Sequence, residues 1–117
     1  QQERAVEALI LLGADRILTS GGAPDVWSGR TQLQKLQSQY GKEITFLAGS
    51  GVNAQNVKAL MEYTRIEQVH TSCRSWQPDV TASLQDVDFS YDISRKNAYE
   101  AVDAGKVKEM LAAMPIL

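Results

Sequence analysis

Residues 40–51 read YGKEITFLAGSG, and this stretch decides the fold. A glycine ends a helical pattern, a short apolar run follows, and the run passes directly into Gly49-Ser50-Gly51. The same succession of helix, strand and small or hydroxylated residues occurs in residues 12–22, LGADRILTSGG, and in residues 63–74, YTRIEQVHTSCR. Strands that alternate with helices in this way are typical of a parallel α/β sheet.

Apolar spacing gives approximate bounds to the helices and strands. It predicts helices over residues 2–12, 28–40, 54–63 and 104–113, with Asn53 as the N-cap of the third. It predicts three strands, over residues 15–19, 43–48 and 67–71. Each connection between strands contains a helix, which suits right-handed βαβ units. Residues 72–95 are polar without a clear period, and they predict a long loop or a partly disordered segment.

Apolar residues are predicted to lie along one side of the first helix and of the last helix. The stripe on the first helix consists of Ala5, Val6, Leu9, Ile10 and Leu12. On the last helix the residues predicted to face inward are Val107, Met110, Leu111 and Met114.

Length and composition narrow the class of protein. A chain of 117 residues is predicted to hold one partial domain over 1–117, because three parallel strands do not close a sheet and the first helix begins without an N-cap. The formal net charge of −2 gives no reason to expect a nucleic-acid partner or a membrane surface. One cysteine, Cys73, cannot form an internal disulfide, so a reducing, cytoplasmic setting is expected.

The strand ends hold the candidate binding residues, because parallel α/β folds bind ligands beyond the carboxyl ends of their strands. Glycines at 49 and 51, on either side of Ser50, would let backbone N–H groups at a helix start approach an anion. The alternative is a tight turn with no ligand. Ser72 and Arg74 follow the next strand, and Arg74 suits a bidentate anion contact. These five residues form the predicted small-anion site.

His70 and Cys73 are the candidate metal ligands. Imidazole and thiolate groups suit Cu(I) or Zn, but two ligands fall short of the roughly four that a closed zinc site uses. The alternative is that both side chains are packed in the protein interior. No base neighbours Ser20 in the sequence, so no nucleophile is predicted and no catalytic residue or reaction is assigned.

Three runs together resemble the family of the copper homeostasis protein CutC. They are LLGADRILTSG at 11–21, AGSGVNAQN at 48–56 and VHTSCRS at 69–75, and the resemblance extends over about 6–114. It implies a TIM-type (β/α)8 barrel, of which this chain is the C-terminal half with strands six, seven and eight. It also implies cytoplasmic copper handling or Cu(I) binding by the complete barrel. The cysteines proposed to bind Cu(I) in the family lie near its amino-terminal strands, and Asp79–Asp92 departs from the basic segment that the family carries there.

Two further expectations follow. The alternative function is a TIM-barrel enzyme that acts on a phosphorylated small molecule, with its anion site at the loops after the second and third strands. The open sheet edges and the uncovered barrel-facing side chains predict a partner, either the missing amino-terminal half of the barrel or a second copy of the chain in a homo-oligomer.

Overall fold

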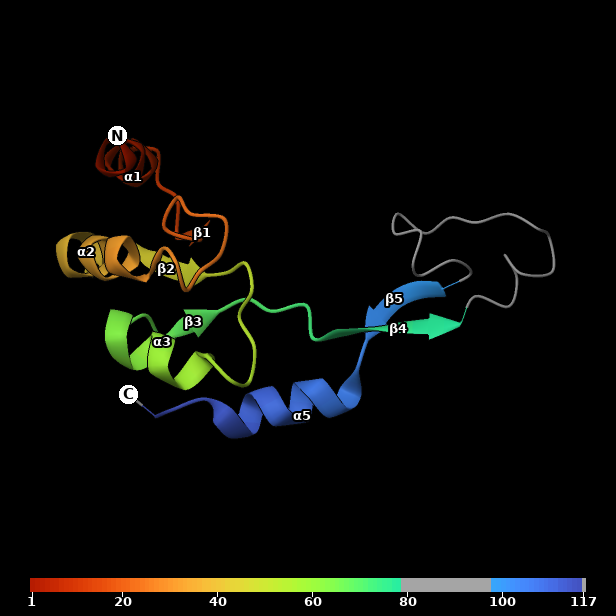
Figure 1. The fold of residues 1–117 in the computed structure, drawn as a ribbon. Helices are drawn as coiled ribbons and strands as arrows, with labels where there is room; N and C mark the ends of the chain where they lie inside the picture. Colours follow the sequence, from red (N-terminus) through yellow and green to blue (C-terminus); the bar gives the residue numbers. More distant parts are fainter. Residues whose placement is uncertain (79–97, 117) are drawn as a thin grey trace. The chain divides into compact units, whose positions relative to one another are not determined.

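The computed structural model describes residues 1–78 and 98–116, which divide into two compact units (Figure 1). The first unit comprises Gln1–Thr71 and Glu109–Leu117, and the second comprises Ser72–Lys108. The expectation of a single partial domain stays a prediction. In the described part of the chain, no helix is long and apolar enough to cross a membrane.

The first unit is a parallel α/β sheet, as the sequence predicts. Its elements alternate in the order α1 (Gln2–Leu11), β1 (Arg16–Thr19), α2 (Arg30–Tyr40), β2 (Thr45–Ala48), α3 (Val57–Thr64) and β3 (Gln68–Val69) (Figure 1). The strands lie in the order β1-β2-β3. Their register pairs Thr19 with Ala48 and Ala48 with Val69, both in parallel. The α/β class and the three parallel strands are therefore confirmed.

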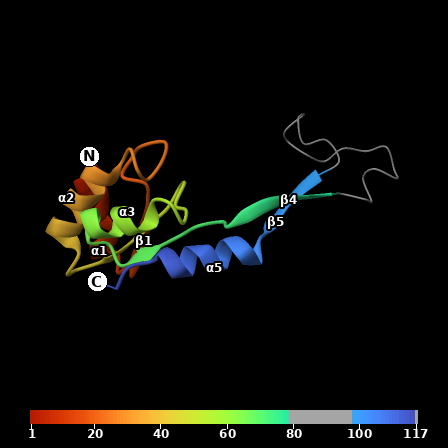
Figure 2. The ribbon, with the colours of Figure 1, turned by 60° about the horizontal axis from the view of Figure 1, so that its bottom comes forward.

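Helices α2 and α3 cover one face of this sheet. They contact each other, and Figures 1 and 2 both show them side by side. Sequential strand order with neighbouring helices on one face is the winding found in (β/α) barrels. A doubly wound sheet instead reverses its strand order and has helices on both faces.

The core of the first unit lies between that sheet face and the helices. Phe46 and Ala48 alternate with less buried neighbours along β2, which is the period of a strand with one covered face. The helices contribute residues at helical spacing, with Leu33 and Leu36 on α2 and Val57, Leu60 and Met61 on α3, all of them buried.

The predicted start of α3 is wrong, and the apolar stripe of α1 is largely exposed. Helix α3 begins at Val57 rather than at residue 54, because the Asn53 side chain accepts the N–H groups of Gln55 and Asn56 and so caps a turn that precedes the helix. On α1 only Val6 is buried, whereas Leu9 and Leu12 of the predicted stripe are 37% and 82% exposed. Leu9 lines an apolar groove together with Ile17 and Leu36.

Backbone contact closes the loop between β1 and α2. A Cβ atom on Gly21 would lie 2.3 Å from the carbonyl oxygen of Gly29, and one on Gly29 would lie 1.8 Å from that of Ser20. Gly21 also has a φ of +78°, which favours glycine. The loop therefore returns on itself at a spacing that only glycine permits.

The second unit contains an antiparallel hairpin. Strand β4 (Arg74–Pro78) pairs with β5 (Ala98–Val102), with Arg74 opposite Val102. The prediction of an irregular segment is thus wrong for 74–78, and the rest of it, 79–95, lies outside the described residues together with the acidic segment Asp79–Asp92. Arg-Ser-Trp-Gln-Pro has no apolar alternation, so the strand depends on backbone pairing with a distant segment that local periodicity does not reveal.

Helix α5 (Ala104–Ala113) has the predicted bounds and lies across the boundary between the two units. The Asp103 carboxylate accepts the N–H of Lys106 at 3.1 Å and caps the helix start. Met110 is buried as predicted, but Leu111 is exposed, so its predicted inward position is wrong.

Candidate functional site

The three strands of the first unit end side by side. The N–H of Gly49 donates to the carbonyl of Thr19 at 3.1 Å, and the N–H of His70 donates to that of Ala48 at 2.8 Å. These bonds continue the parallel ladder to the last residue of each strand. The prediction that the strand ends share one edge of the sheet is confirmed.

Hydrogen bonds also join the loops that follow these strands. The N–H of Val26 donates to the carbonyl of Ser50 at 2.8 Å, and the hydroxyl of Ser50 donates to that of Pro24 at 3.0 Å. The hydroxyl of Thr71, just after β3, donates to the carbonyl of Val52 at 2.8 Å. The loops after β1 and β2 and the end of β3 therefore form one connected layer, held by backbone acceptors.

The Gly49-Ser50-Gly51 turn is tight, as predicted, but an acidic side chain lies next to it. Ser50 and Gly51 both have positive φ angles, of 84° and 80°. The N–H of Gly49 is engaged with Thr19, which leaves fewer amide donors for an anion. The Cβ of Asp25 lies 3.6 Å from where a Cβ on Gly51 would be. Hydrogen bonds from the backbone and hydroxyl of Ser28 lower the pKa of Asp25, so its negative charge weighs against an anion here.

Ser72 and Arg74, the other two residues of the predicted anion site, belong to the second unit. Arg74 begins β4, where its Nε lies 2.6 Å from Oε2 of Glu100 in an ion pair. The backbone carbonyl of Arg74 accepts the ammonium of Lys106 at 2.7 Å. The guanidinium thus already has a carboxylate partner, which sequence spacing did not indicate because the two residues are distant along the chain. The five-residue anion site stays a prediction.

His70 lies on the face of the sheet opposite α2 and α3. Ala48 is buried toward the helices, so the next residue, Gly49, faces the other way. A Cβ atom on Gly49 would lie 2.7 Å from Cδ1 of Leu18 and 3.4 Å from the Cβ of His70. Leu18 and His70 therefore flank Gly49 on this second face, which we call the open face. Both side chains are exposed.

Two further residues of the open face are joined by a hydrogen bond that the sequence did not indicate. Arg16, at the start of β1, donates through Nη1 to the side-chain oxygen of Gln68 on β3 at 3.4 Å. Leu47, between them on β2, pairs with both Leu18 and Gln68 in the sheet register. The register alone could have revealed this group, since strand alternation places Arg16, Leu18, Gln68 and His70 on one face.

The predicted metal ligands are not brought into one described cluster. Cys73 belongs to the second unit, where it is partly buried with a φ of +44°. Within residues 1–78 and 98–116, no three His, Cys, Asp or Glu side chains come together in a way that could hold a metal ion. The assignment of His70 and Cys73 as metal ligands stays a prediction.

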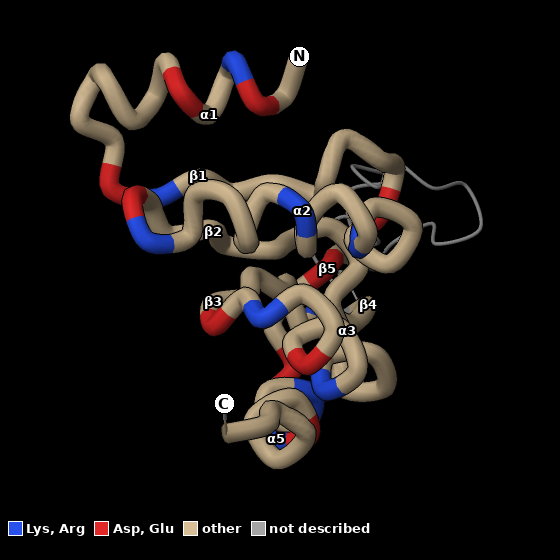
Figure 3. The backbone as a smooth tube through the Cα atoms, turned by 90° about the vertical axis from the view of Figure 1, so that its left-hand side faces the viewer, with Lys and Arg blue, Asp and Glu red and all other residues tan. Residues whose placement is uncertain are grey.

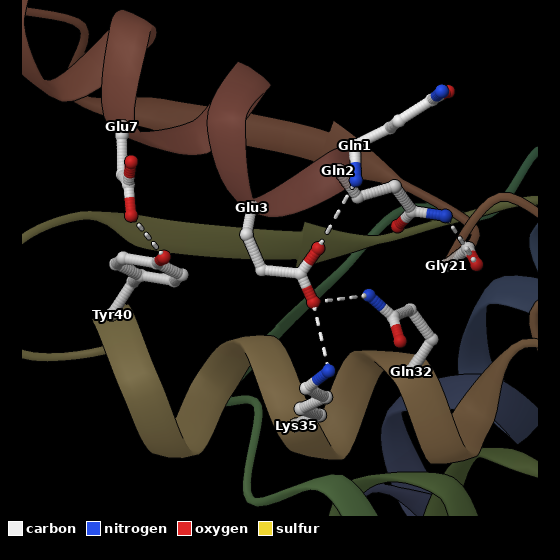
Figure 4. Close-up of polar contacts among 8 residues, drawn as sticks. All are labelled: Gln1, Gln2, Glu3, Glu7, Gly21, Gln32, Lys35 and Tyr40. Atoms are coloured by element: carbon white, nitrogen blue, oxygen red, sulfur yellow. Dashed lines mark hydrogen bonds and ion pairs between the residues drawn. The ribbon is translucent and has the colours of Figure 1, made fainter.

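A polar cluster places α1 beside α2 (Figure 4). The carboxylate of Glu3 lies 3.0 Å from Nζ of Lys35 and accepts the side-chain amide of Gln32 at 3.3 Å. The hydrogen bond from the backbone N–H of Glu3 and those from Lys35 and Gln32 lower the pKa of Glu3 to about 2. Figure 3 shows that α1 carries charges of both signs, and Lys35 of α2 is the partner of an acidic one.

The remaining contacts of this cluster hold the start and the middle of α1. Near its start, the side chain of Gln2 donates to the carbonyl of Gly21 at 3.1 Å, which ties α1 to the loop after β1 (Figure 4). One helical turn after Glu3, the carboxylate of Glu7 accepts the hydroxyl of Tyr40 at 2.7 Å. This bond raises the pKa of Tyr40 to about 12. Helix α1 is thereby tied to α2 and to the loop after β1.

Comparison with known proteins gives a consistent family. The family model of the CutC family matches residues 1–75. A protein of Glaesserella parasuis serovar 5 (strain SH0165), described as family protein CutC, is 34% identical over 113 residues, which cover 97% of this chain and 46% of that protein. The protein of the same description from Rhizobium meliloti (strain 1021) is 32% identical over 110 residues, or 94% of this chain and 43% of that protein.

A protein of Vibrio campbellii, also described as family protein CutC, is 43% identical over 76 residues, or 65% of this chain and 31% of that protein. The chain thus spans less than half the length of the relatives it matches. The matched residues include the strands and strand-end loops described above. The family match and the identity over nearly the whole chain show that this chain belongs to the CutC family.

Proposed function

We propose that this chain forms the carboxyl-terminal part of a TIM-type barrel and that the complete protein acts in copper homeostasis in the cytoplasm. The observation that carries the proposal is that the CutC family model matches the first unit, whose parallel strands follow one another in sequence order as they do in a barrel. The copper role comes from the CutC resemblance, and the single cysteine is compatible with a reducing compartment.

The open face supports the barrel. One face of the sheet packs against helices, and the other carries Leu18, which is 58% exposed, together with the exposed His70. In a TIM-type barrel such a face is interior and is filled by side chains from all strands. Further strands would remove Leu18 from water at a gain of about 25 cal/mol per Å² of apolar area.

Copper would be the cargo of the complete barrel, and His70 is the described residue best placed to meet it. Its imidazole lies at the carboxyl end of β3, on the face that the proposed barrel encloses. A nitrogen donor of this kind suits copper, and a thiolate such as that of Cys73 suits Cu(I). The described residues bring together no group of three potential ligands, so tight binding would require ligands from the rest of the barrel.

A competition experiment tests this function. Cu(I) held by a coloured chelator is titrated with the full-length Glaesserella parasuis relative and, separately, with this chain. We expect the relative to withdraw copper stoichiometrically, and this chain to withdraw it with an affinity weaker by more than about tenfold, since it lacks part of the ligand set. A relative that leaves all copper with the chelator would overturn the copper role.

Variants of this chain test the two candidate ligands. His70→Ala and Cys73→Ala should each weaken the residual binding, whereas Thr45→Ala, an exposed change at the opposite end of the sheet, should leave it unchanged. Residual binding that is the same in all three variants would show that neither His70 nor Cys73 contacts the metal.

A further inference from the structure

The hairpin of the second unit has two outer edges, whose backbone groups can be assigned from its register. The N–H of Asp103 donates to the carbonyl of Cys73 at 2.7 Å, so the backbone groups of this pair face inward. In an antiparallel ladder the inward pairs alternate with pairs whose N–H and C=O groups face outward. The outward groups therefore belong to residues 74, 76 and 78 of β4 and to residues 98, 100 and 102 of β5.

The outer edge of β4 is protected against a further strand. Its last residue, Pro78, has no N–H group to donate. At its other end, the outward carbonyl of Arg74 accepts the ammonium of Lys106, at the start of α5, at 2.7 Å. Proline and lysine are among the residues with which natural proteins block strand edges. A further strand would therefore find one donor missing and one acceptor already engaged on this side of the hairpin.

The outer edge of β5 has no comparable protection. Strand β5 (Ala98–Val102) contains neither proline nor lysine, and within residues 1–78 and 98–116 no backbone hydrogen bond engages its outward groups. Tyr99 and Val102 are 49% and 73% exposed. The sheet has only two strands, and an isolated two-stranded sheet is marginally stable in water. A third strand on this edge would satisfy its backbone groups and stabilise the hairpin.

This edge is complementary to itself. Two identical strand edges can pair antiparallel about a two-fold axis, because the axis matches each donor of one copy with an acceptor of the other. An axis at Tyr99 places the two Tyr99 residues in a non-hydrogen-bonded pair, where side chains are closest and aromatic pairs stabilise a sheet. An axis at Glu100 would place two carboxylates opposite each other, which is unfavourable. Charge and aromatic pairing therefore both favour the axis at Tyr99.

We infer that the outer edge of β5 is an interface with a second copy of this chain, in which two β5 strands pair antiparallel about an axis at Tyr99. The two hairpins then form one continuous sheet. Glu100 of each copy exchanges two backbone hydrogen bonds with Ala98 of the other copy. The interface uses neither the parallel sheet of the first unit nor its strand ends, so it does not depend on the proposed barrel or on copper, and its test contains no metal.

Thiol cross-linking tests the pairing and its register. In a Cys73→Ser background, Tyr99→Cys and Ala101→Cys each provide the only thiol of the chain. With the axis at Tyr99, the two copies of residue 99 have Cα atoms about 4.5 Å apart, which a disulfide can bridge. The two copies of residue 101 are four positions out of register, or roughly 14 Å apart, which is too far. Mild oxidation should therefore give a disulfide-linked dimer from Tyr99→Cys and not from Ala101→Cys.

Sedimentation equilibrium under reducing conditions tests the backbone pairing. Glu100→Ala and Glu100→Pro both remove the ion pair with Arg74, but only proline also removes the outward N–H at this position. By symmetry each dimer then loses two hydrogen bonds, so Glu100→Pro should weaken dimerisation by at least about tenfold relative to Glu100→Ala. Glu100→Ala is the matched control, because its N–H is retained and its inward neighbours are unchanged.

A second variant keeps the test valid if proline disrupts the hairpin. Hydrogen exchange of the Asp103 N–H, which bonds to Cys73, shows whether the hairpin is intact. Tyr99→Lys leaves the backbone donors in place and puts two like charges opposite each other at the axis, so it should also weaken the dimer by at least about tenfold. Lys108→Arg, an exposed change on α5 that keeps its charge, should leave dimerisation unchanged.

Three results would overturn the inference. The chain could remain a monomer at every concentration and give no cross-link from Tyr99→Cys. It could form a dimer that cross-links through Ala101→Cys, or one that Tyr99→Lys does not weaken, which would place the interface or its axis elsewhere. Finally, the Glu100 N–H could be as protected from exchange in the monomer as in the dimer, which would show that another segment of the same chain occupies the edge of β5.

Discussion

The parallel sheet of the first unit and the antiparallel hairpin of the second are held together in different ways. Every buried hydrophobic residue within the described ranges belongs to the first unit, where β2 packs beneath α2 and α3. The hairpin is held by its backbone ladder, the Arg74–Glu100 ion pair and the bond from Lys106 to the carbonyl of Arg74. One region depends on removing apolar surface from water, and the other depends on polar contacts near the surface.

The match of the family model ends close to the same boundary. The family model ends at residue 75, a few residues after the first unit gives way to the second at Ser72. The family pattern therefore describes the parallel sheet and its strand ends, whereas most of the hairpin lies beyond it. In order of decreasing effect, two predictions compare the two units and two concern the polar contacts of α1 within the first unit.

Removing a buried aromatic side chain from the sheet should have a much larger effect on stability than truncating an exposed side chain of the hairpin. Phe46 is 1% exposed at the centre of the sheet, and Phe46→Ala should lower the free energy of unfolding by about 3–5 kcal/mol. Val102, in the hairpin, is 73% exposed, and Val102→Ala should change it by less than about 0.5 kcal/mol. Urea unfolding followed by circular dichroism measures both. Similar losses in the two variants would contradict the division.

Breaking the ion pair should affect only the hairpin. Arg74→Ala leaves Glu100 without its cation, and because the Arg74 side chain is 59% exposed the loss should be about 1 kcal/mol or less. Amide hydrogen exchange should quicken in β5 and remain unchanged in β2. Faster exchange in β2 as well would show that the two units unfold together.

Acid should weaken the contact between α1 and α2. The pKa of Glu3 is lowered from 4.5 to about 2, so its carboxylate contacts stabilise the folded state fully above pH 4.5 and are lost as the pH falls through about 2. The Glu3→Gln variant should lack this part of the acid dependence of unfolding, whereas Glu62→Gln, an exposed change on α3, should retain it. If both variants retain it, Glu3 is not the titrating group.

The smallest effect concerns Tyr40. Its hydrogen bond to Glu7 favours the neutral phenol and raises the pKa to about 12, so this contact stabilises the folded state below pH 10 and is lost as the pH rises through about 12. Ultraviolet titration of the folded protein should show one tyrosine that ionises later than the others. That late step should move toward pH 10 in Glu7→Gln, and an unchanged step would assign it to another tyrosine.

Local patterns in the sequence were sufficient for the first unit. Gly41 and the apolar run after it predicted β2, and three similar runs predicted parallel pairing and neighbouring strand ends. These features are local, because a helix and a buried strand each have a period that a short window contains. The family resemblance followed from three overlapping runs, at 11–21, 48–56 and 69–75, and all of them fall within the matched residues.

The features that the sequence did not predict depend on contacts between segments that are distant along the chain. Strand β4 has no apolar period and exists because β5 lies opposite it, so the sequence indicated a loop. The pairing of Arg74 with Glu100 was missed for the same reason. On α1 the sequence showed the apolar stripe, but it could not show that Leu9 and Leu12 are exposed, because burial depends on a second surface. A sequence pattern shows which side of a helix is apolar, but it does not show whether another part of the protein covers that side.

The backbone contact between Gly21 and Gly29 has a consequence for how this family member can vary. Each position lacks room for even a methyl group, because the obstructing atom in each case is a carbonyl oxygen of the main chain. No repacking of side chains can relieve such a clash, so the two sites are linked, and neither can change unless the loop is rebuilt. In a library of all single substitutions, both positions should tolerate no replacement at all, although neither lies in the core of the sheet or on its open face.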